Sequence, residues 1–91
     1  MESEPKPRIL VVDDEATIRR VVCTFCRSLE GVECLEASSG REAVKLFDTH
    51  KIDLVISDLN MPGETGLHVL EHVRASGHSI PVMIFSSSPV R

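Results

Sequence analysis

Residues 9–15 read Ile-Leu-Val-Val-Asp-Asp-Glu, four aliphatic side chains followed directly by three carboxylates. A short run of apolar, mostly β-branched residues is typical of a strand that is buried on both faces. Such strands occur mainly in parallel sheets whose two faces are covered by helices. The stretch therefore predicts a buried strand at residues 9–12 that carries acidic side chains at its carboxyl end.

Short apolar runs alternate with amphipathic stretches through the rest of the chain. The runs predict three further strands, at residues 32–37, 52–57 and 81–85. Apolar residues at steps of three and four predict three helices, at residues 16–29, at residues 41–48, and from about Leu67 to a point before Gly77. Met-Pro-Gly within residues 60–65 predicts a loop. The order βαβαβαβ predicts one α/β domain with a doubly wound parallel sheet at residues 8–91, after a flexible tail at residues 1–7.

The helix predicted at residues 16–29 combines an apolar stripe, a charged pair and two of the three cysteines. Its expected core-facing stripe is Ile18, Val21, Val22, Phe25 and Leu29. Its charged pair, Arg19 and Arg20, is expected to be solvated. Cys23, Cys26 and Cys34 are an odd number, which suits a reducing compartment better than a disulfide scaffold. We expect these cysteines to behave as small apolar residues, although Cys23-x-x-Cys26 on its own would also fit half of a redox or zinc site.

Length, charge and hydropathy exclude several classes of function. The chain has 91 residues, a net charge of −4 and no cluster of basic residues, so direct binding to nucleic acid is not expected. No stretch approaches the roughly 20 apolar residues of a membrane span, and the N-terminus lacks the apolar run of a signal peptide. We therefore expect a cytoplasmic protein with no membrane partner.

Polar residues follow three of the predicted strands. Asp13 and Asp14 follow the first, Asp58 follows the third, and Ser86 follows the fourth. The carboxyl ends of parallel strands meet at one edge of a sheet, where open α/β sheets carry their reactive site. Three carboxylates crowded there need a hard divalent cation, and Mg²⁺ is expected to bind them, with Mn²⁺ as an alternative.

The motifs at this edge resemble the receiver domains of response regulators, the phosphoacceptor modules of two-component signalling. The resemblance rests on the aspartate pair after 9–12 and on Asp-Leu-Asn-Met-Pro-Gly-Glu-Thr-Gly at residues 58–66. Further similarity lies in residues 31–37, in Gly-Arg-Glu-Ala at residues 40–43, and in Pro-Val-Met-Ile-Phe-Ser at residues 81–86. It covers residues 8–88 and implies a flavodoxin-like fold.

The resemblance also implies a role for each residue. Asp58 would accept a phosphoryl group from a sensor histidine kinase or a histidine phosphotransfer protein. Asp13, Asp14, Asp58 and the backbone carbonyl of Asn60 would hold Mg²⁺, and Ser86 would act as the hydroxyl switch. Partners would also include a downstream output domain or target that the resemblance does not name. Such a chain is a signalling domain rather than an enzyme, beyond some self-phosphorylation from small donors and self-dephosphorylation.

Three alternatives remain at this point. The family's domain normally continues through a fourth helix, a fifth strand with a lysine and a fifth helix, so this chain could be an inert interaction module or a fragment that takes no phosphate. Strand 82–85 would then be an open edge, able to pair with another chain in a dimer, and apolar surface beside helix 16–29 would be exposed. A phosphatase with an aspartate nucleophile is disfavoured, because Asn60 stands where its acid would be. His68 and His72 could in principle bind a surface metal, but we expect a solvated polar face.

Overall fold

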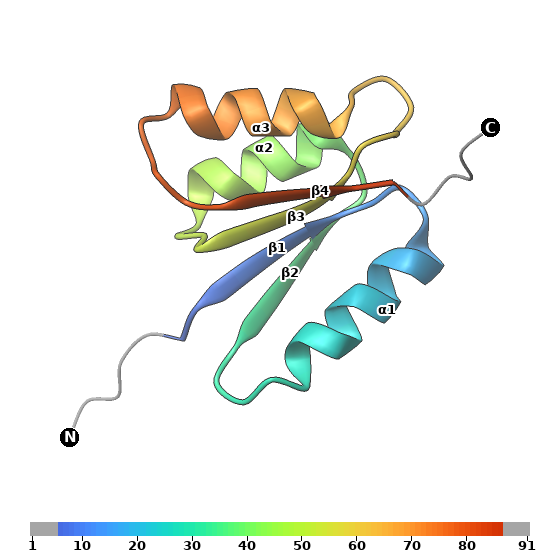
Figure 1. The fold of residues 1–91 in the computed structure, drawn as a ribbon, viewed down its shortest axis with the longest axis vertical. Coiled ribbons are helices and arrows are strands. Elements are labelled where there is room, and N and C mark those ends of the chain that lie inside the picture. Colours follow the sequence, from blue (N-terminus) through green and yellow to red (C-terminus); the bar gives the residue numbers. More distant parts are fainter. Residues whose placement is uncertain (1–5, 87–91) are drawn as a thin grey trace.

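The computed structural model describes residues 6–86, which form a single parallel sheet with helices on both faces (Figure 1). The elements, in chain order, are β1 (Arg8–Val12), α1 (Ala16–Arg27), β2 (Glu33–Ala37), α2 (Gly40–Thr49), β3 (Leu54–Asp58), α3 (Gly66–Ala75) and β4 (Val82–Phe85). Each predicted strand and helix is present, with ends that differ from the prediction by no more than two residues. The α/β, flavodoxin-like prediction is confirmed.

The strands follow the order β2-β1-β3-β4, and every neighbouring pair is parallel. The chain leaves β1 for an outer position at β2 and then returns through α2 to the other side of β1. This reversal makes the gap between β1 and β3 the switch point of the sheet, where ligands of open α/β folds bind. The register pairs Val12 with Ser57, so the residues that follow on both strands emerge side by side.

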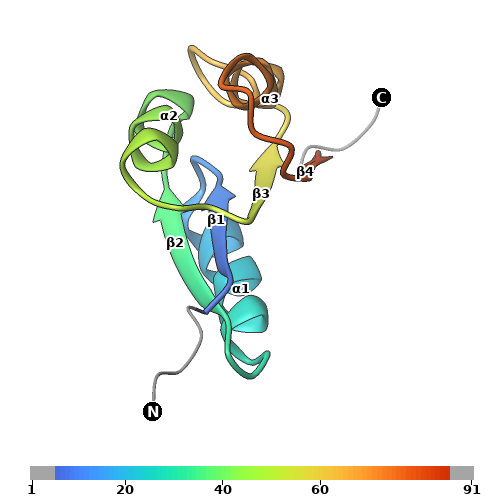
Figure 2. The ribbon, with the colours of Figure 1, turned by 90° about the vertical axis from the view of Figure 1, so that its left-hand side faces the viewer.

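The helices divide between the faces: α1 covers one, and α2 and α3 cover the other (Figures 1 and 2). Alternate residues of β1 point to opposite faces of the sheet and so contribute to both cores. Leu10 and Val12 join the core under α2 and α3, whereas Ile9 and Val11 join the core under α1. Burying an aliphatic side chain of this size contributes about 1.5–3 kcal/mol, which is why the apolar run at β1 fixes the centre of the sheet.

The predicted core-facing stripe of α1 is only partly correct. Val21, Phe25 and Leu29 are 64%, 68% and 46% exposed, while Cys23 and Cys26 are buried. The reason is that α1 packs on β1 and β2 and makes no comparable contact with β3 or β4. One flank of its apolar face is therefore left open, as expected for the surface beside this helix, and Met83 on β4 is exposed as well.

The expectation that the cysteines behave only as small apolar residues is wrong for two of the three. Cys23 on α1 and Cys34 on β2 form a disulfide, with their Cα atoms 6.1 Å apart. Packing of the helix on the neighbouring strand brings the two residues together, which spacing along the chain does not reveal. Cys26 is a free, buried thiol, as expected.

The described residues end close to the first and last strands of the sheet. Residues 1–5 of the predicted tail and residues 87–91 lie outside the described residues. Pro7, within the described part, accepts a hydrogen bond from the backbone N–H of Glu33 at 2.9 Å. Among residues 6–86, no helix has the length and apolar character needed to cross a bilayer.

Candidate functional site: an acidic cluster at the switch point

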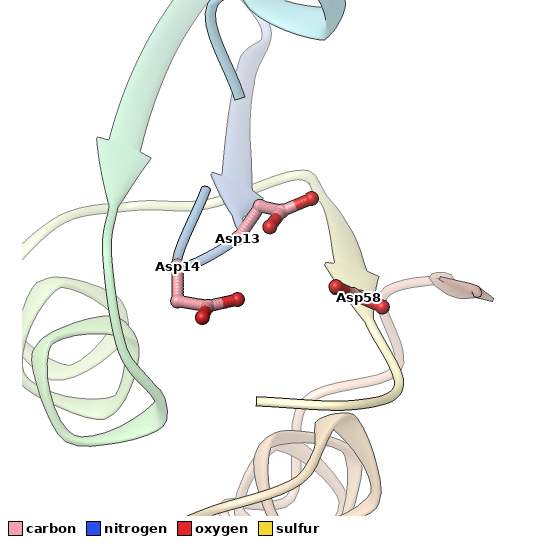
Figure 3. Close-up of side chains that lie close together, drawn as sticks. All are labelled: Asp13, Asp14 and Asp58. Carbon is pink, nitrogen blue, oxygen red and sulfur yellow. The ribbon is translucent and has the colours of Figure 1, made fainter. Parts of the chain in front are cut away.

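Three carboxylates meet at the carboxyl ends of β1 and β3 (Figure 3). Asp13 and Asp14 follow β1, and Asp58 is the last residue of β3. One oxygen from each carboxylate lies within 4.8 Å of the other two. Asp13 and Asp58 are 0% and 2% exposed, whereas Asp14 is exposed. The cluster is therefore buried on two sides and open to solvent on the third.

Asp13 is held in an unfavourable environment for a charged group. Its Oδ1 accepts a hydrogen bond from the N–H of Glu15 at 2.9 Å, while its Oδ2 is buried with no hydrogen-bond partner among the described residues. Burial raises the pKa of Asp13; the bond from Glu15 lowers it, and the nearby charges of Asp58, Asp14 and Glu15 raise it again. A cation beside Oδ2 would reverse this penalty, so the donor set fits a hard divalent metal ion.

Asp58 is linked to the neighbouring turn and strand. Its Oδ1 accepts the N–H of Asn60 at 3.2 Å, and the Asn60 side-chain amide donates to Oγ of Ser86 at 3.4 Å. The N–H of Leu59 donates to the carbonyl of Phe85 at 2.6 Å, which joins the ends of β3 and β4. Asn60 and Ser86 are thus next to each other at the edge that carries Asp58.

The loop after Asp58 is fixed by one buried side chain and one glycine. Met61 is 7% exposed and packs in the core under α2 and α3. The N–H of Gly66 donates to the carbonyl of Leu59 at 2.9 Å. A Cβ atom on Gly66 would lie 2.5 Å from the carbonyl oxygen of Asp58, closer than real Cβ atoms approach. Any larger residue at position 66 must displace the backbone of Asp58.

Arg19, which we expected to be solvated, instead connects α1 to the site. Its side chain is 15% exposed, and Nη1 donates to the carbonyl of Asp13 at 2.8 Å. Its Nε donates to Oε1 of Glu36 on β2 at 2.9 Å. Nothing in the sequence pointed to these contacts, because Glu36 comes from another element of the fold. Arg20 is exposed, as predicted.

The two histidines of α3 have separate acidic partners. Nε2 of His68 lies 3.3 Å from Glu64, and Nε2 of His72 lies 2.8 Å from Asp48 on α2. Within residues 6–86, the only group of acidic, cysteine or histidine side chains arranged to hold a metal is the cluster of Asp13, Asp14 and Asp58. The polar-face interpretation of His68 and His72 therefore agrees with the structure.

Comparisons with known proteins agree with this geometry. The model of the response regulator receiver domain matches residues 9–90. The chemotaxis protein CheY of Pseudomonas aeruginosa is 34% identical over 86 residues, which make up 92% of this chain and 69% of that protein. The sensor histidine kinase RcsC of Salmonella typhimurium is 35% identical over 82 residues, covering 90% of this chain but 8% of the kinase.

A solved structure matches as well. The response regulator TrrA of Thermotoga maritima, in complex with Mg²⁺-BeF, has a TM-score of 0.83 and 38% identity, covering 90% of this chain and 70% of TrrA. The chain thus spans between 8% and 70% of the length of these relatives. From the matched residues and the shared sheet, we conclude that the chain belongs to the response regulator receiver domain family.

Proposed function

We propose that this chain accepts a phosphoryl group on Asp58 in a Mg²⁺-dependent reaction, and so relays a signal from a histidine kinase or a histidine phosphotransfer protein. The observation that carries the proposal is the buried Asp58 carboxylate within 4.8 Å of Asp13 and Asp14, at the switch point of the sheet.

Asp13, Asp14 and Asp58 would hold the metal ion, together with the backbone carbonyl of Asn60. The buried, unpartnered Oδ2 of Asp13 supports this assignment. The Mg²⁺-BeF complex of the relative TrrA supports Mg²⁺ as the ion, and Mn²⁺ would satisfy the same oxygen donors. When bound, the ion supplies the positive charge that a transferring phosphoryl group requires.

The reaction forms one bond and breaks another at phosphorus. A carboxylate oxygen of Asp58 attacks the phosphorus of a phosphohistidine, a P–O bond forms as the P–N bond breaks, and the donor imidazole leaves with the electron pair and takes up a proton. The product on this chain is an acyl phosphate. The hydrogen bond from the N–H of Asn60 to Oδ1 helps to orient the Asp58 carboxylate for this attack.

Ser86 would report the presence of the phosphate. Its Oγ lies 3.4 Å from the Asn60 amide, at the edge that carries Asp58. A hydroxyl can donate to a phosphoryl oxygen, and movement of Ser86 toward the phosphate would pull on the end of β4. The result is a change at the surface of β4 that an output domain or target protein could recognise.

The remaining parts of the proposal concern surroundings and partners. We place the chain in the cytoplasm, where the proposed kinase partners would phosphorylate it. β4 is an outer strand whose four residues, Val82–Phe85, carry no charge, so its edge is suited to pairing with a second copy or another chain.

Intact-mass spectrometry after incubation with acetyl phosphate and Mg²⁺ tests the proposal. We expect one phosphoryl adduct on the parent chain, and none on Asp58→Asn or in a sample with the metal chelated. Asp48→Asn, which changes an exposed carboxylate on α2, is the matched control and should be labelled normally. A parent chain that takes no phosphate, under conditions that label a receiver of known activity, would instead indicate an inert interaction module.

A further inference from the structure

The disulfide between Cys23 and Cys34 is not part of the acidic cluster of Asp13, Asp14 and Asp58. It joins α1 to β2, and with Cys26 it forms part of the core on the α1 side of the sheet. Cys23 and Cys34 are 0% and 8% exposed. Three sulfur atoms are thus gathered in one small core, two of them joined and one free.

The contact between α1 and β2, called the α1 seam below, also carries polar contacts that lead to the acidic cluster. Arg27 donates to the carbonyl of Cys34 at 3.2 Å, and Arg19 bridges Glu36 and the carbonyl of Asp13. Cys23 lies between these two arginines on the helix, four residues from each. The disulfide therefore holds the middle of this seam, between two polar ends. At one end Arg19, in the first turn of α1, binds the carbonyl of Asp13.

From this arrangement we propose that Cys23 and Cys34 are a reversible redox couple that locks α1 onto β2 and orders the segment between Asp13 and Arg19. Reduction by two molecules of a small thiol breaks the S–S bond. Each protein sulfur gains one electron and one proton, and the two small thiols leave joined as a disulfide. A small-molecule disulfide drives the reverse reaction. This inference does not depend on phosphoryl transfer.

Cys26 limits the chemistry to one pair. Its burial raises the pKa of the thiol, so little of the reactive thiolate is present near neutral pH. Exchange of the native disulfide into a link with Cys26 is therefore disfavoured. Because both paired sulfurs are buried, a reductant reaches them only when α1 opens locally, and reduction should accelerate in mild denaturant.

The difference between the two states should appear in amide exchange. A disulfide that closes a short loop removes conformational freedom from the opened helix. We expect α1 amides to exchange on the order of 10- to 100-fold more slowly in the oxidised chain. One amide outside α1 should follow the helix. The N–H of Glu15 bonds to Asp13, and the carbonyl of Glu15 accepts the N–H of Arg19 within α1.

The experiment uses the whole chain, without metal, equilibrated with reduced or oxidised glutathione. Alkylation and peptide mapping count free thiols, and hydrogen–deuterium exchange reports on residues 14–27. We expect three free thiols in the reduced chain and one, Cys26, in the oxidised chain, with exchange slowed in α1 by oxidation. Cys26→Ala should behave in the same way, and Cys34→Ala should lose the redox effect.

Two results would overturn the proposal. One is the absence of a link between Cys23 and Cys34, or a link through Cys26 instead. The other is a correct link that leaves exchange in residues 14–27 unchanged. Because wild-type protein serves for both arms, poor folding of a variant does not affect the outcome.

Discussion

Replacing Asp13 with asparagine should stabilise the metal-free chain and should greatly weaken the stabilisation that Mg²⁺ provides. Asparagine has nearly the same shape, and its side-chain oxygen can still accept the hydrogen bond that Glu15 donates to Oδ1. What is lost is a negative charge in a place where burial and neighbouring carboxylates raise the pKa of Asp13. The variant separates the electrostatic cost of the cluster from its packing.

The size of the effect follows from the separation of the charges. Two unit charges 4.8 Å apart repel by about 3 kcal/mol at an effective dielectric constant of 20, and by about 1 kcal/mol in bulk water. Asp13 and Asp58 are buried beside an opening to solvent, between these limits. Asp13→Asn should therefore raise the free energy of unfolding by about 1–3 kcal/mol, and each kcal/mol raises the melting temperature of a small domain by roughly 4–8 °C.

Thermal unfolding followed by circular dichroism is the appropriate assay, since the chain has no Trp or Tyr. In EDTA the variant should melt above the parent chain. In Mg²⁺ at 100 times its dissociation constant the parent chain should gain about 2.7 kcal/mol, and the variant much less. Glu71→Gln, an exposed change on α3, should match the parent chain in both buffers. Equal melting of Asp13→Asn and parent chain in EDTA, with equal gains from Mg²⁺, would refute the electrostatic reasoning.

Three further predictions concern pH, the loop and the α1 seam. Because the pKa of Asp13 is raised in the folded chain, the folded state binds the proton more tightly than the unfolded state does. Without metal, the contribution of Asp13 to the free energy of unfolding should therefore fall as pH rises from about 4 through that raised pKa. Urea titrations of the parent chain and of Asp13→Asn should diverge over this pH window. Gly66→Ala should lower the free energy of unfolding in urea by about 1–3 kcal/mol, because the new Cβ would meet the carbonyl oxygen of Asp58. A Cβ at Gly77 would meet no atom, so Gly77→Ala should show only the effect of backbone strain. Arg19→Ala should lower the free energy of unfolding by about 1.5–3 kcal/mol in the same assay, because it breaks two charge-assisted hydrogen bonds. A loss no larger than that of Arg20→Ala would contradict the role given to Arg19 in joining α1 to the site.

The sheet and the acidic cluster were largely predictable from the sequence, for physical reasons. Buried parallel strands must be apolar throughout, so β1 and β3 stand out as runs of aliphatic residues. Once both strands belong to one parallel sheet, Asp13 and Asp58 must emerge at the same edge. Their pairing therefore follows from local patterns together with one topological rule.

The α1 seam could not be predicted in the same way. Helical spacing identified Val21 and Phe25 as core residues, but which flank of an apolar helix is buried depends on where it lies across the sheet. The disulfide and the Arg19 contacts depend on the same placement, since Cys34 and Glu36 come from another element. Nor does a pair of adjacent aspartates reveal that Asp13 is buried while Asp14 is exposed.

The most direct test of the central claim is to locate the phosphoryl group after labelling with acetyl phosphate and Mg²⁺. Borohydride reduces an acyl phosphate to an alcohol, so the modified aspartate can be identified as homoserine by peptide mapping. We predict homoserine at position 58, with Asp13 and Asp14 intact. Homoserine at position 13 or 14, or none in a chain that gained the phosphoryl mass, would contradict the assignment of Asp58 as the phosphoacceptor.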